Sequence, residues 1–339
     1  MKVLAVTNLF PTEAAPASGT FVHEQVESLR TIGVDVDVLH IRRAEGRGAY
    51  LRLARTIARA VERSRPDVVH AMYGGVLAYG AARALRGQSQ PLVISFCGSD
   101  LLGGGDGGLG MQARERLGVL ASRRSLAHTA GVIVKSAGLE RALPASFPRD
   151  RVWVIPSGVD LELFVPRDHG EARHELGWAP DLRTVLFASA TTRPEKRFDR
   201  AQAAFAGVER RRPDVELRAL DGVARADVPL WLNAADVVLL TSSTEGSPNV
   251  IKEALACCTP IVSVDVGDVR ERIDGIAGNA VVEPTPDALA AALLAALEAP
   301  RDPRARERAA SVSLERTSEQ TRAVYEAVLD DSPAREPQG

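Results

Sequence analysis

The chain has 339 residues, of which 45% are apolar and 25% are charged, and its formal net charge is −2. This is the composition of a folded globular protein, and the length favours two domains. The charge balance excludes a coherent basic face for nucleic acid, and no apolar run approaches the roughly 18 residues that span a bilayer. We therefore expect no nucleic-acid partner and a cytoplasmic protein.

Short β-branched runs alternate with helical stretches in the first half, which predicts a parallel sheet wrapped by helices. Strands are predicted at Lys2–Thr7, Asp35–His40, Val68–Ala71, Leu92–Phe96, Gly131–Val134 and Val152–Pro156. Helices are predicted near Phe21–Thr31, Ala49–Ser64, Gly75–Leu85 and Met111–His128. We assign these elements to a first Rossmann-like domain over residues 1–163.

The pattern restarts after a polar, turn-rich stretch at 164–182, which we interpret as a linker region. A second Rossmann-like domain over 183–312 has predicted strands at Thr184–Ala188, Val215–Ala219, Asp236–Thr241, Pro260–Val264 and Ala280–Val282. Its helices are predicted near Arg197–Arg210, Pro248–Ala256 and Pro286–Leu297. A closing helix at 313–330 and a disordered tail at 331–339 complete the prediction.

The fold class is therefore α/β, with two doubly wound parallel sheets. Such sheets bind ligands at the carboxyl ends of their strands. We expect the two sheets to face each other across an interdomain cleft, which would hold the ligand.

The segment T-E-G-S-P-N-V-I-K-E-A-L-A places Glu245 before, and Glu253 within, a largely apolar helix. Ser247 suits an N-cap and Pro248 the first helical position. The free backbone N–H groups over Gly246–Val250 can bind an anion, and the two carboxylates can bind hydroxyl groups on either side of a diphosphate. That arrangement fits a nucleotide sugar. A capped core helix with a structural glutamate explains the same residues.

Metal-binding patterns are weak in this sequence. Cys97, Cys257 and Cys258 lack metal-ligand spacing, and the six histidines are scattered. The D-V-D triplet Asp35–Asp37 lies inside an alternating strand pattern, which favours a half-buried strand over a metal site. We therefore predict no metal ion and no cofactor.

Four arginines form a stripe on one predicted helix, opposite three apolar residues. The stripe consists of Arg52, Arg55, Arg59 and Arg63, and the apolar residues are Leu53, Ile57 and Val61. A solvated face explains it. Peripheral association with the inner face of a membrane is the alternative, if the acceptor is membrane-borne.

Four segments together resemble one known family. They are V-I-P-S-G-V-D-L-E-L-F (Val154–Phe164), N-A-A-D-V-V-L-L-T-S (Asn233–Ser242), E-G-S-P-N-V-I-K-E-A-L-A (Glu245–Ala256) and P-I-V-S-V-D-V-G-D-V-R-E (Pro260–Glu271). The chain resembles the retaining, metal-independent GT-B glycosyltransferases of glycosyltransferase family 4, over nearly its whole length. This resemblance implies the GT-B fold and a nucleotide-sugar donor.

The resemblance also implies roles for individual residues. Glu245 would contact the donor sugar, and Glu253 would bind the ribose hydroxyl groups. R-P-E-K would supply Arg193 and Lys196 to the phosphates, although Thr191 stands where the family usually has its arginine. The other implied donor-binding residues are Gly246, Ser247, Pro248, Asn249 and Val250 around the diphosphate, Gly19 and Thr20 at the first helix, Gly222 and Val223 in the base loop, and Cys97, where many members carry histidine.

The predicted reaction is transfer of a hexose-type sugar to an acceptor hydroxyl with retention of the anomeric configuration. The acceptor could be a glycan, a lipid-linked sugar or a small molecule. Two alternatives are a nucleotide-sugar epimerase on the same scaffold and a non-catalytic nucleotide-sugar-binding subunit.

Overall fold

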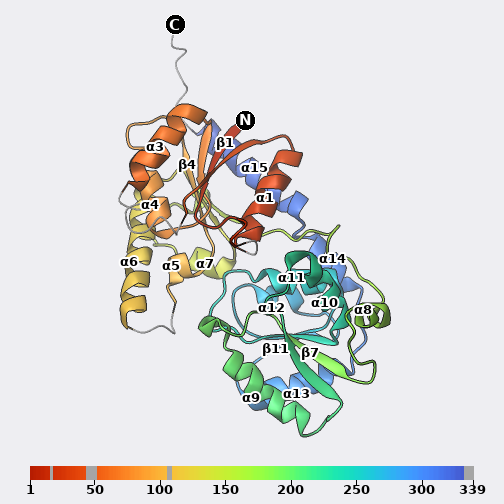
Figure 1. Cartoon of the computed structure of the whole chain (residues 1–339). Coiled ribbons are helices and arrows are strands. Elements are labelled where there is room, and N and C mark those ends of the chain that lie inside the picture. Colours follow the sequence, from red (N-terminus) through yellow and green to blue (C-terminus); the bar gives the residue numbers. More distant parts are fainter. Residues whose placement is uncertain (16–17, 43–51, 105–108, 332–339) are drawn as a thin grey trace. The chain divides into compact units, whose positions relative to one another are not determined.

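The computed structural model describes residues 1–15, 18–42, 52–104 and 109–331, and it divides into two compact units. The first unit consists mainly of the chain up to Gly158 together with the C-terminal stretch from Leu314. The second consists mainly of Val159–Ser313. Both units are α/β (Figure 1).

A six-stranded parallel sheet forms the centre of the first unit, in the order β2-β1-β3-β4-β5-β6. Its strands are β1 (Lys2–Thr7), β2 (Asp35–His40), β3 (Val68–Ala71), β4 (Leu92–Phe96), β5 (Gly131–Val134) and β6 (Val152–Val154). The six predicted strands are confirmed, and only β6 ends earlier than predicted. Its described α-helices are α1 (Thr20–Thr31), α3 (Leu53–Ser64), α4 (Gly75–Ala84), α5 (Ser99–Leu102), α6 (Leu109–Ser125), α7 (Ala137–Ala142) and α15 (Leu314–Asp330).

Strand alternation divides the core of the first unit into two layers. On β1, Leu4 and Val6 pack with α3 and α4, whereas Val3 and Ala5 pack with α1 and α15. Successive side chains of a strand point to opposite faces, so a sheet with apolar residues at every position must be covered on both sides. Each buried Leu or Val contributes roughly 1.5–3 kcal/mol to this packing.

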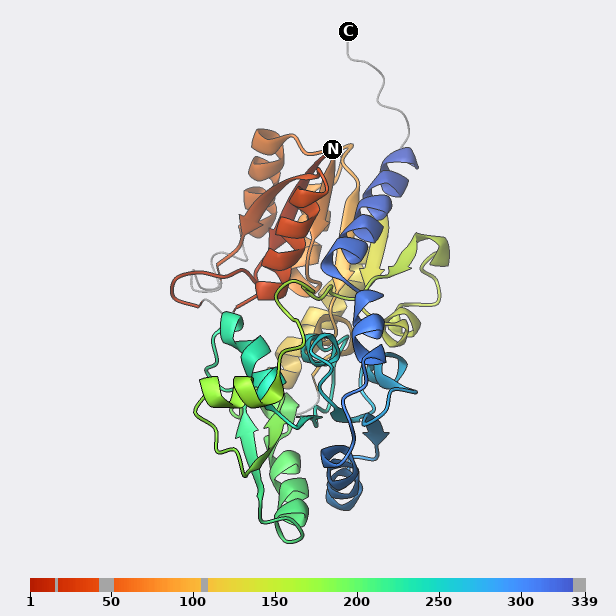
Figure 2. The same cartoon turned by 90° about the vertical axis from the view of Figure 1, so that its right-hand side faces the viewer.

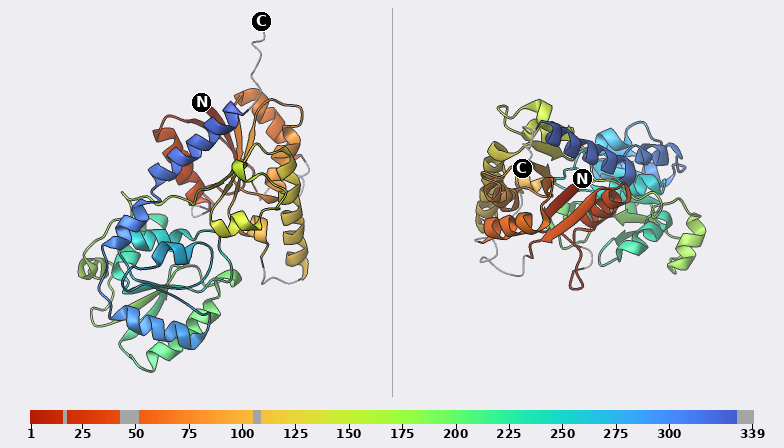
Figure 3. Two further views of the ribbon diagram at one scale, coloured as in Figure 1. Left: turned by 180° about the vertical axis from the view of Figure 1, so that it is seen from behind. Right: turned by 90° about the horizontal axis from the view of Figure 1, so that it is seen from above.

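The C-terminal helix α15 belongs to the first unit, although the chain reaches it from the second. It lies beside α1 (Figures 2 and 3). Tyr325 Oη is 2.7 Å from Nδ1 of the buried His70, whose Nε2 is 2.8 Å from Ser95 Oγ. Burial, with a smaller contribution from the Lys135 charge, lowers the pKa of His70 to about 3. The neutral imidazole therefore joins α15 to β3 and β4.

The second unit has a five-stranded parallel sheet in the order β11-β10-β9-β7-β8. Its strands are β7 (Arg183–Phe187), β8 (Val215–Ala219), β9 (Val237–Leu240), β10 (Ile261–Val264) and β11 (Ala280–Val282), all within one residue of the predicted bounds. Its α-helices are α8 (His169–Glu175), α9 (Phe198–Glu209), α10 (Val228–Ala234), α11 (Asn249–Ala256), α12 (Val269–Ile273), α13 (Pro286–Leu297) and α14 (Arg304–Ala310). Helices α9 and α13 cover one face, and α10, α11, α12 and α14 lie on the other (Figure 1).

The stretch at 164–182 is packed structure of the second unit and not the linker that we predicted. Asp168 caps α8 by accepting from the Glu171 N–H, and Ala172 and Trp178 are buried in a small cluster with Ala234. The turn residues that suggested a linker are the cap and the exit of this short helix. The predicted tail at 331–339 lies outside the described residues, apart from Asp331.

Candidate functional site

The strand order of the second sheet identifies where a ligand can bind. After β7 the chain forms β8 on one side, then crosses to form β9 on the other side of β7. The connections that leave β7 and β9 therefore run in opposite directions at the carboxyl edge. A crevice at such a switch point is the usual ligand site of open α/β sheets.

Lys196 and Glu245 meet at this switch point. Lys196 ends a short 3-10 turn, η4 (Pro194–Lys196), that follows β7, and Glu245 follows β9. The Lys196 Nζ lies 2.5 Å from Glu245 Oε1, and Ser242 Oγ donates to the same carboxylate oxygen at 2.8 Å. Both charged side chains are about 15% exposed. The pair is thus partly desolvated, where charge–charge attraction is stronger than at a free surface.

Backbone contacts hold the two connections together. Thr241 Oγ1 donates to the carbonyl oxygen of Lys196 at 3.0 Å, and the Ser243 N–H donates to the carbonyl oxygen of Glu195 at 2.9 Å. Earlier in the same loop, Thr191 Oγ1 donates to Asp221, which follows β8, at 2.7 Å. The loop that presents Lys196 is therefore fixed by residues after both β8 and β9.

Arg193 does not join this pair. Its guanidinium forms an ion pair with Glu195 at 2.6 Å, and the Arg193 side chain is 57% exposed. The two basic residues of R-P-E-K thus have different surroundings, because Glu195 neutralises one while Glu245 orients the other. The structure brings together Lys196 and Glu245 from the predicted catalytic set and leaves Arg193 at the surface.

The helix that carries Glu253 begins later than we predicted. Helix α11 starts at Asn249 and Pro248 is its N-cap, so Ser247 does not cap it. The Ser247 hydroxyl instead accepts from Lys252 Nζ at 2.9 Å and donates to Asp268 Oδ2 at 2.9 Å. Lys252 is buried, and a buried ammonium group needs acceptors. Because the Ser247 hydroxyl bonds Lys252 and Asp268, it does not cap the helix.

The turn before α11 is shaped by a close backbone approach. Gly267 has φ of +59°, and a Cβ there would lie 2.8 Å from the carbonyl oxygen of Gly246. Only glycine fits this position at low cost. Pro248 has no N–H to donate, but the N–H groups of Asn249 and Val250 open the helix, where no intrahelical acceptor precedes them. These amides form the positive end of α11.

Glu253 is paired with a residue that sequence reasoning missed. Arg225 Nη1 donates to Glu253 Oε1 at 2.6 Å, and the Glu253 side chain is only 7% exposed. The Arg225 guanidinium also lies over the ring of Phe164, 4.7 Å from its centroid. Arg225 follows the predicted base loop, in which Gly222 adopts φ of +71° next to Val223. The available signal was the buried carboxylate itself, which requires a partner.

In the first unit, Gly19 and Thr20 occupy the predicted helix start. Gly19 precedes α1 with φ of +70°, and a Cβ there would lie 2.3 Å from the carbonyl carbon of Leu9. The loop after β1 therefore crosses the start of α1 in direct backbone contact, which explains the need for glycine at this position.

Cys97 follows β4 above a buried carboxylate. Asp100 accepts from the N–H groups of Gly74, Cys97 and Gly98 at 2.8–3.1 Å. Burial raises the pKa of Asp100, although these backbone hydrogen bonds oppose the shift. Burial lowers the pKa of the nearby Lys135, because it disfavours the charged form of either group. Cys97 thus lies at the carboxyl edge of this sheet in a polar, largely buried environment.

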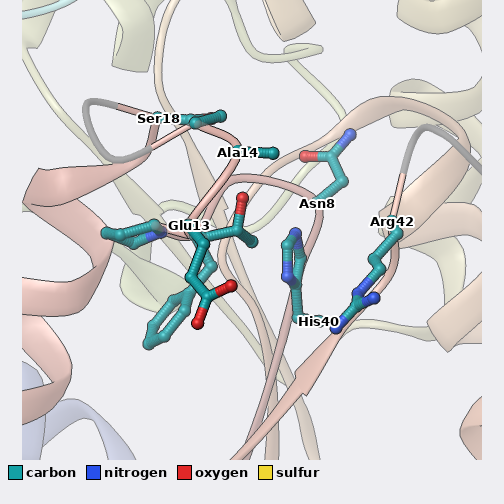
Figure 4. A pocket seen from close by; sticks show the side chains of 10 residues that line it. Asn8, Glu13, Ala14, Ser18, His40 and Arg42 are labelled. Atoms are coloured by element: carbon teal, nitrogen blue, oxygen red, sulfur yellow. The ribbon is translucent and has the colours of Figure 1, made fainter.

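A cavity of about 840 Å³ opens at the carboxyl ends of β1 and β2 (Figure 4). Asn8 and His40 come from the two strand ends, and Arg42 follows His40. Glu13, on the loop after β1, faces them across the opening (Figure 4). Amide, imidazole, carboxylate and guanidinium groups together can bind a polyhydroxylated or anionic ligand.

Two family models match consecutive parts of the chain. Residues 3–158 match the glycosyl transferase 4-like domain, and residues 185–299 match the glycosyl transferases group 1 domain. The chain belongs to the group 1 glycosyltransferases. Its two Rossmann-like units are the two domains of the GT-B fold, and the match boundaries agree with the division at Gly158.

Curated relatives of this glycosyltransferase chain include two named D-inositol 3-phosphate glycosyltransferase. The protein from Geodermatophilus obscurus is 29% identical over 67% of this chain, and the one from Actinosynnema mirum is 33% identical over 47%. These matches span 59% and 45%, respectively, of the relatives' own length.

Solved structures share the fold of this glycosyltransferase chain at low identity. Sucrose-phosphate synthase from Thermosynechococcus elongatus has a TM-score of 0.80 at 17% identity, covering 98% of this chain and all of that one. HepE from Anabaena, in complex with UDP-glucose, has a TM-score of 0.70 at 17% identity, covering 96% of this chain and all of that one.

In residues 1–15, 18–42, 52–104 and 109–331, no helix is long and apolar enough to cross a membrane. Within the same ranges, no group of three or more histidine, cysteine, aspartate or glutamate side chains is placed to hold a metal ion. Asp37 of the D-V-D triplet contacts Lys2 and Ser64.

Proposed function

We propose that this chain transfers a hexose-type sugar from a nucleotide-diphosphate-sugar donor to an acceptor hydroxyl, with retention and without a metal ion. The observation that carries the proposal is the Lys196–Glu245 pair, 2.5 Å apart at the switch point between β7 and β9. A cation and a carboxylate at this position match a donor that joins an anionic diphosphate to a hydroxylated sugar.

The departing diphosphate gains negative charge in the transition state. In the proposed complex, Lys196 and the N–H groups that open α11 bind this charge, while Glu245 faces the sugar as positive charge develops at its anomeric carbon. Preorganised donors of this kind typically contribute about 3–4 kcal/mol each to lowering a barrier. The acceptor hydroxyl attacks from the face that the diphosphate leaves, and the diphosphate takes its proton.

Glu253 binds the ribose hydroxyl groups in this proposal. The carboxylate is nearly buried and already accepts from Arg225, so one of its oxygens is oriented before the donor arrives. Gly222 and Val223, close to Arg225 in sequence, form the loop proposed to contact the base. The HepE complex makes UDP-glucose the first donor to test.

For the acceptor we propose the cavity of the first unit. Its four convergent polar residues, Asn8, Glu13, His40 and Arg42, suit a hydroxylated acceptor that also carries an anionic group. The named activity of the D-inositol 3-phosphate relatives agrees with an acceptor of that chemistry.

The test measures UDP release from UDP-glucose, with and without candidate acceptors such as inositol phosphates. We expect release that depends on the acceptor, and a glucosylated product that keeps the α-anomeric configuration. An isomerised nucleotide sugar formed from donor alone would instead identify an epimerase. Binding of nucleotide sugars without turnover on any acceptor would favour the non-catalytic subunit.

Metal dependence is tested in the same assay. We expect release to continue at an unchanged rate after dialysis against EDTA. A loss of rate that Mg²⁺ or Mn²⁺ restores would contradict the metal-independent mechanism.

A further inference from the structure

Helix α6 is fixed in the first unit by one of its faces. Ser122 Oγ accepts from the Gly75 N–H at 2.7 Å and donates to the carbonyl oxygen of Asp100 at 2.6 Å. Ser122 and Ser125 are fully buried. These contacts join α6 to the start of α4 and to α5, and α6 lies next to both (Figure 3). The opposite face of α6 must therefore point away from the core.

That outward face combines leucine with arginine. Residues spaced three and four apart share one side of a helix, and here the large exposed side chains of that side are Arg116, Leu117, Leu120, Arg123 and Arg124, which we call the α6 face. Leu117 is 64% exposed and Leu120 is 43% exposed. Exposing large apolar side chains to water is unfavourable.

The two helices next to α6 also carry exposed apolar side chains. Val76 of α4 and Leu102 of α5 are also exposed. A Cβ on Gly75 would lie 4.0 Å from Gly118, and one on Gly103 would lie 3.8 Å from Val119, so both segments flank the middle of α6. In the described part of the chain, four of the six exposed large apolar side chains therefore belong to α4, α5 and α6.

The charge on this surface has one sign. Arg116, Arg123 and Arg124 form no ion pair with any other described residue, and the sole acidic residue of α6, Glu115, is half-buried. Long arginine side chains can lie along apolar surface while their guanidinium groups reach anions. The α6 face thus combines two exposed leucines with three arginines.

We propose that the α6 face docks this protein onto an anionic lipid bilayer. Leu117 and Leu120 would enter the boundary between headgroups and acyl chains, while the three arginines bind lipid phosphates. Helices that lie in a membrane interface combine these two properties. The α3 stripe lacks this combination, because its arginines are exposed but Leu53, Ile57 and Val61 are buried beneath them. This docking does not depend on the proposed donor chemistry.

Co-sedimentation with vesicles tests the proposal. The full chain is mixed with vesicles of phosphatidylcholine containing 30% phosphatidylglycerol, and with pure phosphatidylcholine, in 100 mM NaCl. We expect binding to the anionic vesicles that weakens as salt is raised. One arginine near an anionic surface contributes about fivefold to binding, so R116Q/R123Q/R124Q should weaken it on the order of 100-fold. L117S/L120S should weaken it by about tenfold or more, because less apolar area is buried.

The matched control is R55Q/R59Q/R63Q on α3, which removes the same charge from another exposed helix of this unit. We expect it to bind anionic vesicles within threefold of the wild type. Equal losses in the two arginine triples, or no wild-type binding to anionic vesicles, would overturn the proposal. Circular dichroism melting curves establish that each variant is folded. In an L117W variant, the fluorescence of the introduced tryptophan should be quenched by brominated lipid. A lack of quenching would also count against docking.

Discussion

Arg225 donates to the Glu253 carboxylate at 2.6 Å while its guanidinium lies over the ring of Phe164. Three segments far apart in sequence therefore meet at one nearly buried carboxylate. Because the Glu253 side chain is 7% exposed, this carboxylate needs a partner within the protein. The pair links the stability of the second unit to the group that we propose for ribose binding.

Replacing Arg225 should destabilise the second unit. R225M leaves Glu253 charged and without this partner, so the free energy of unfolding should fall by about 2 kcal/mol. Adding E253Q removes the unpaired charge, and the double variant should recover more than half of the loss. Urea denaturation in a W153F background measures this, because Trp178 and Trp231 then report on the second unit alone. Additive losses in the double-mutant cycle would show that the two residues are not coupled.

E253Q should weaken the donor through the ribose. We expect the Kd of UDP to rise by about tenfold, because a charged hydrogen-bond acceptor is lost. The matched ligand is 2′,3′-dideoxy-UDP, which has no ribose hydroxyl groups and should bind the wild type and E253Q equally. Isothermal titration calorimetry measures both ligands. An equal loss of affinity for UDP and for the dideoxy ligand would place Glu253 elsewhere in the site.

Lys196 and Arg193 should differ sharply in catalysis. K196A removes the cation that faces Glu245, and kcat should fall by about 100- to 1,000-fold, as when one transition-state donor is lost. R193A removes an exposed residue that pairs with Glu195, and kcat should stay within threefold. Steady-state UDP release measures both variants. Comparable losses would mean that Arg193 leaves Glu195 when the donor binds.

His70 should make the first unit sensitive to acid. Its folded pKa of about 3 lies below its unfolded value of 6.5, so the unfolded chain binds the extra proton between these pH values. The stability contribution is therefore complete above pH 6.5 and is lost as the pH falls, by up to about 1.4 kcal/mol per pH unit.

Urea denaturation of a W178F/W231F background, in which Trp153 reports on the first unit, measures this dependence. H70N removes the titrating group and should flatten the stability profile between pH 6 and 4. An unchanged slope in H70N would assign the acid sensitivity to other groups.

G19A should be more damaging than G33A. Both glycines have positive φ, but the added Cβ meets the Leu9 backbone at 2.3 Å in G19A and nothing within 4 Å in G33A. We expect G33A to cost about 1 kcal/mol, from backbone conformation alone, and G19A to cost several times more because backbone must move. The same Trp153 denaturation assay compares them. Equal costs would show that the loop after β1 yields easily.

The sheets could be predicted from sequence because their strands are short, β-branched and bounded by turns. Five strands of the first unit have the predicted ends, and those of the second differ by at most one residue at either end. Short helices were missed, among them α8 and α10, because seven residues give too little periodicity. The start of α11 was misplaced because Lys252 and Asp268, not the helix terminus, use the Ser247 hydroxyl.

The sequence alone was sufficient for the strands and the family, because these depend on local patterns. Tertiary structure decided which charges meet. It paired Lys196 with Glu245 and Arg225 with Glu253, and it left Arg193 at the surface. It also brought Tyr325 of α15 into contact with His70, which lies 255 residues earlier in the chain. The physical reason is that a partly buried charge takes the partner that strand order and loop path bring within reach, and neither is encoded in local spacing.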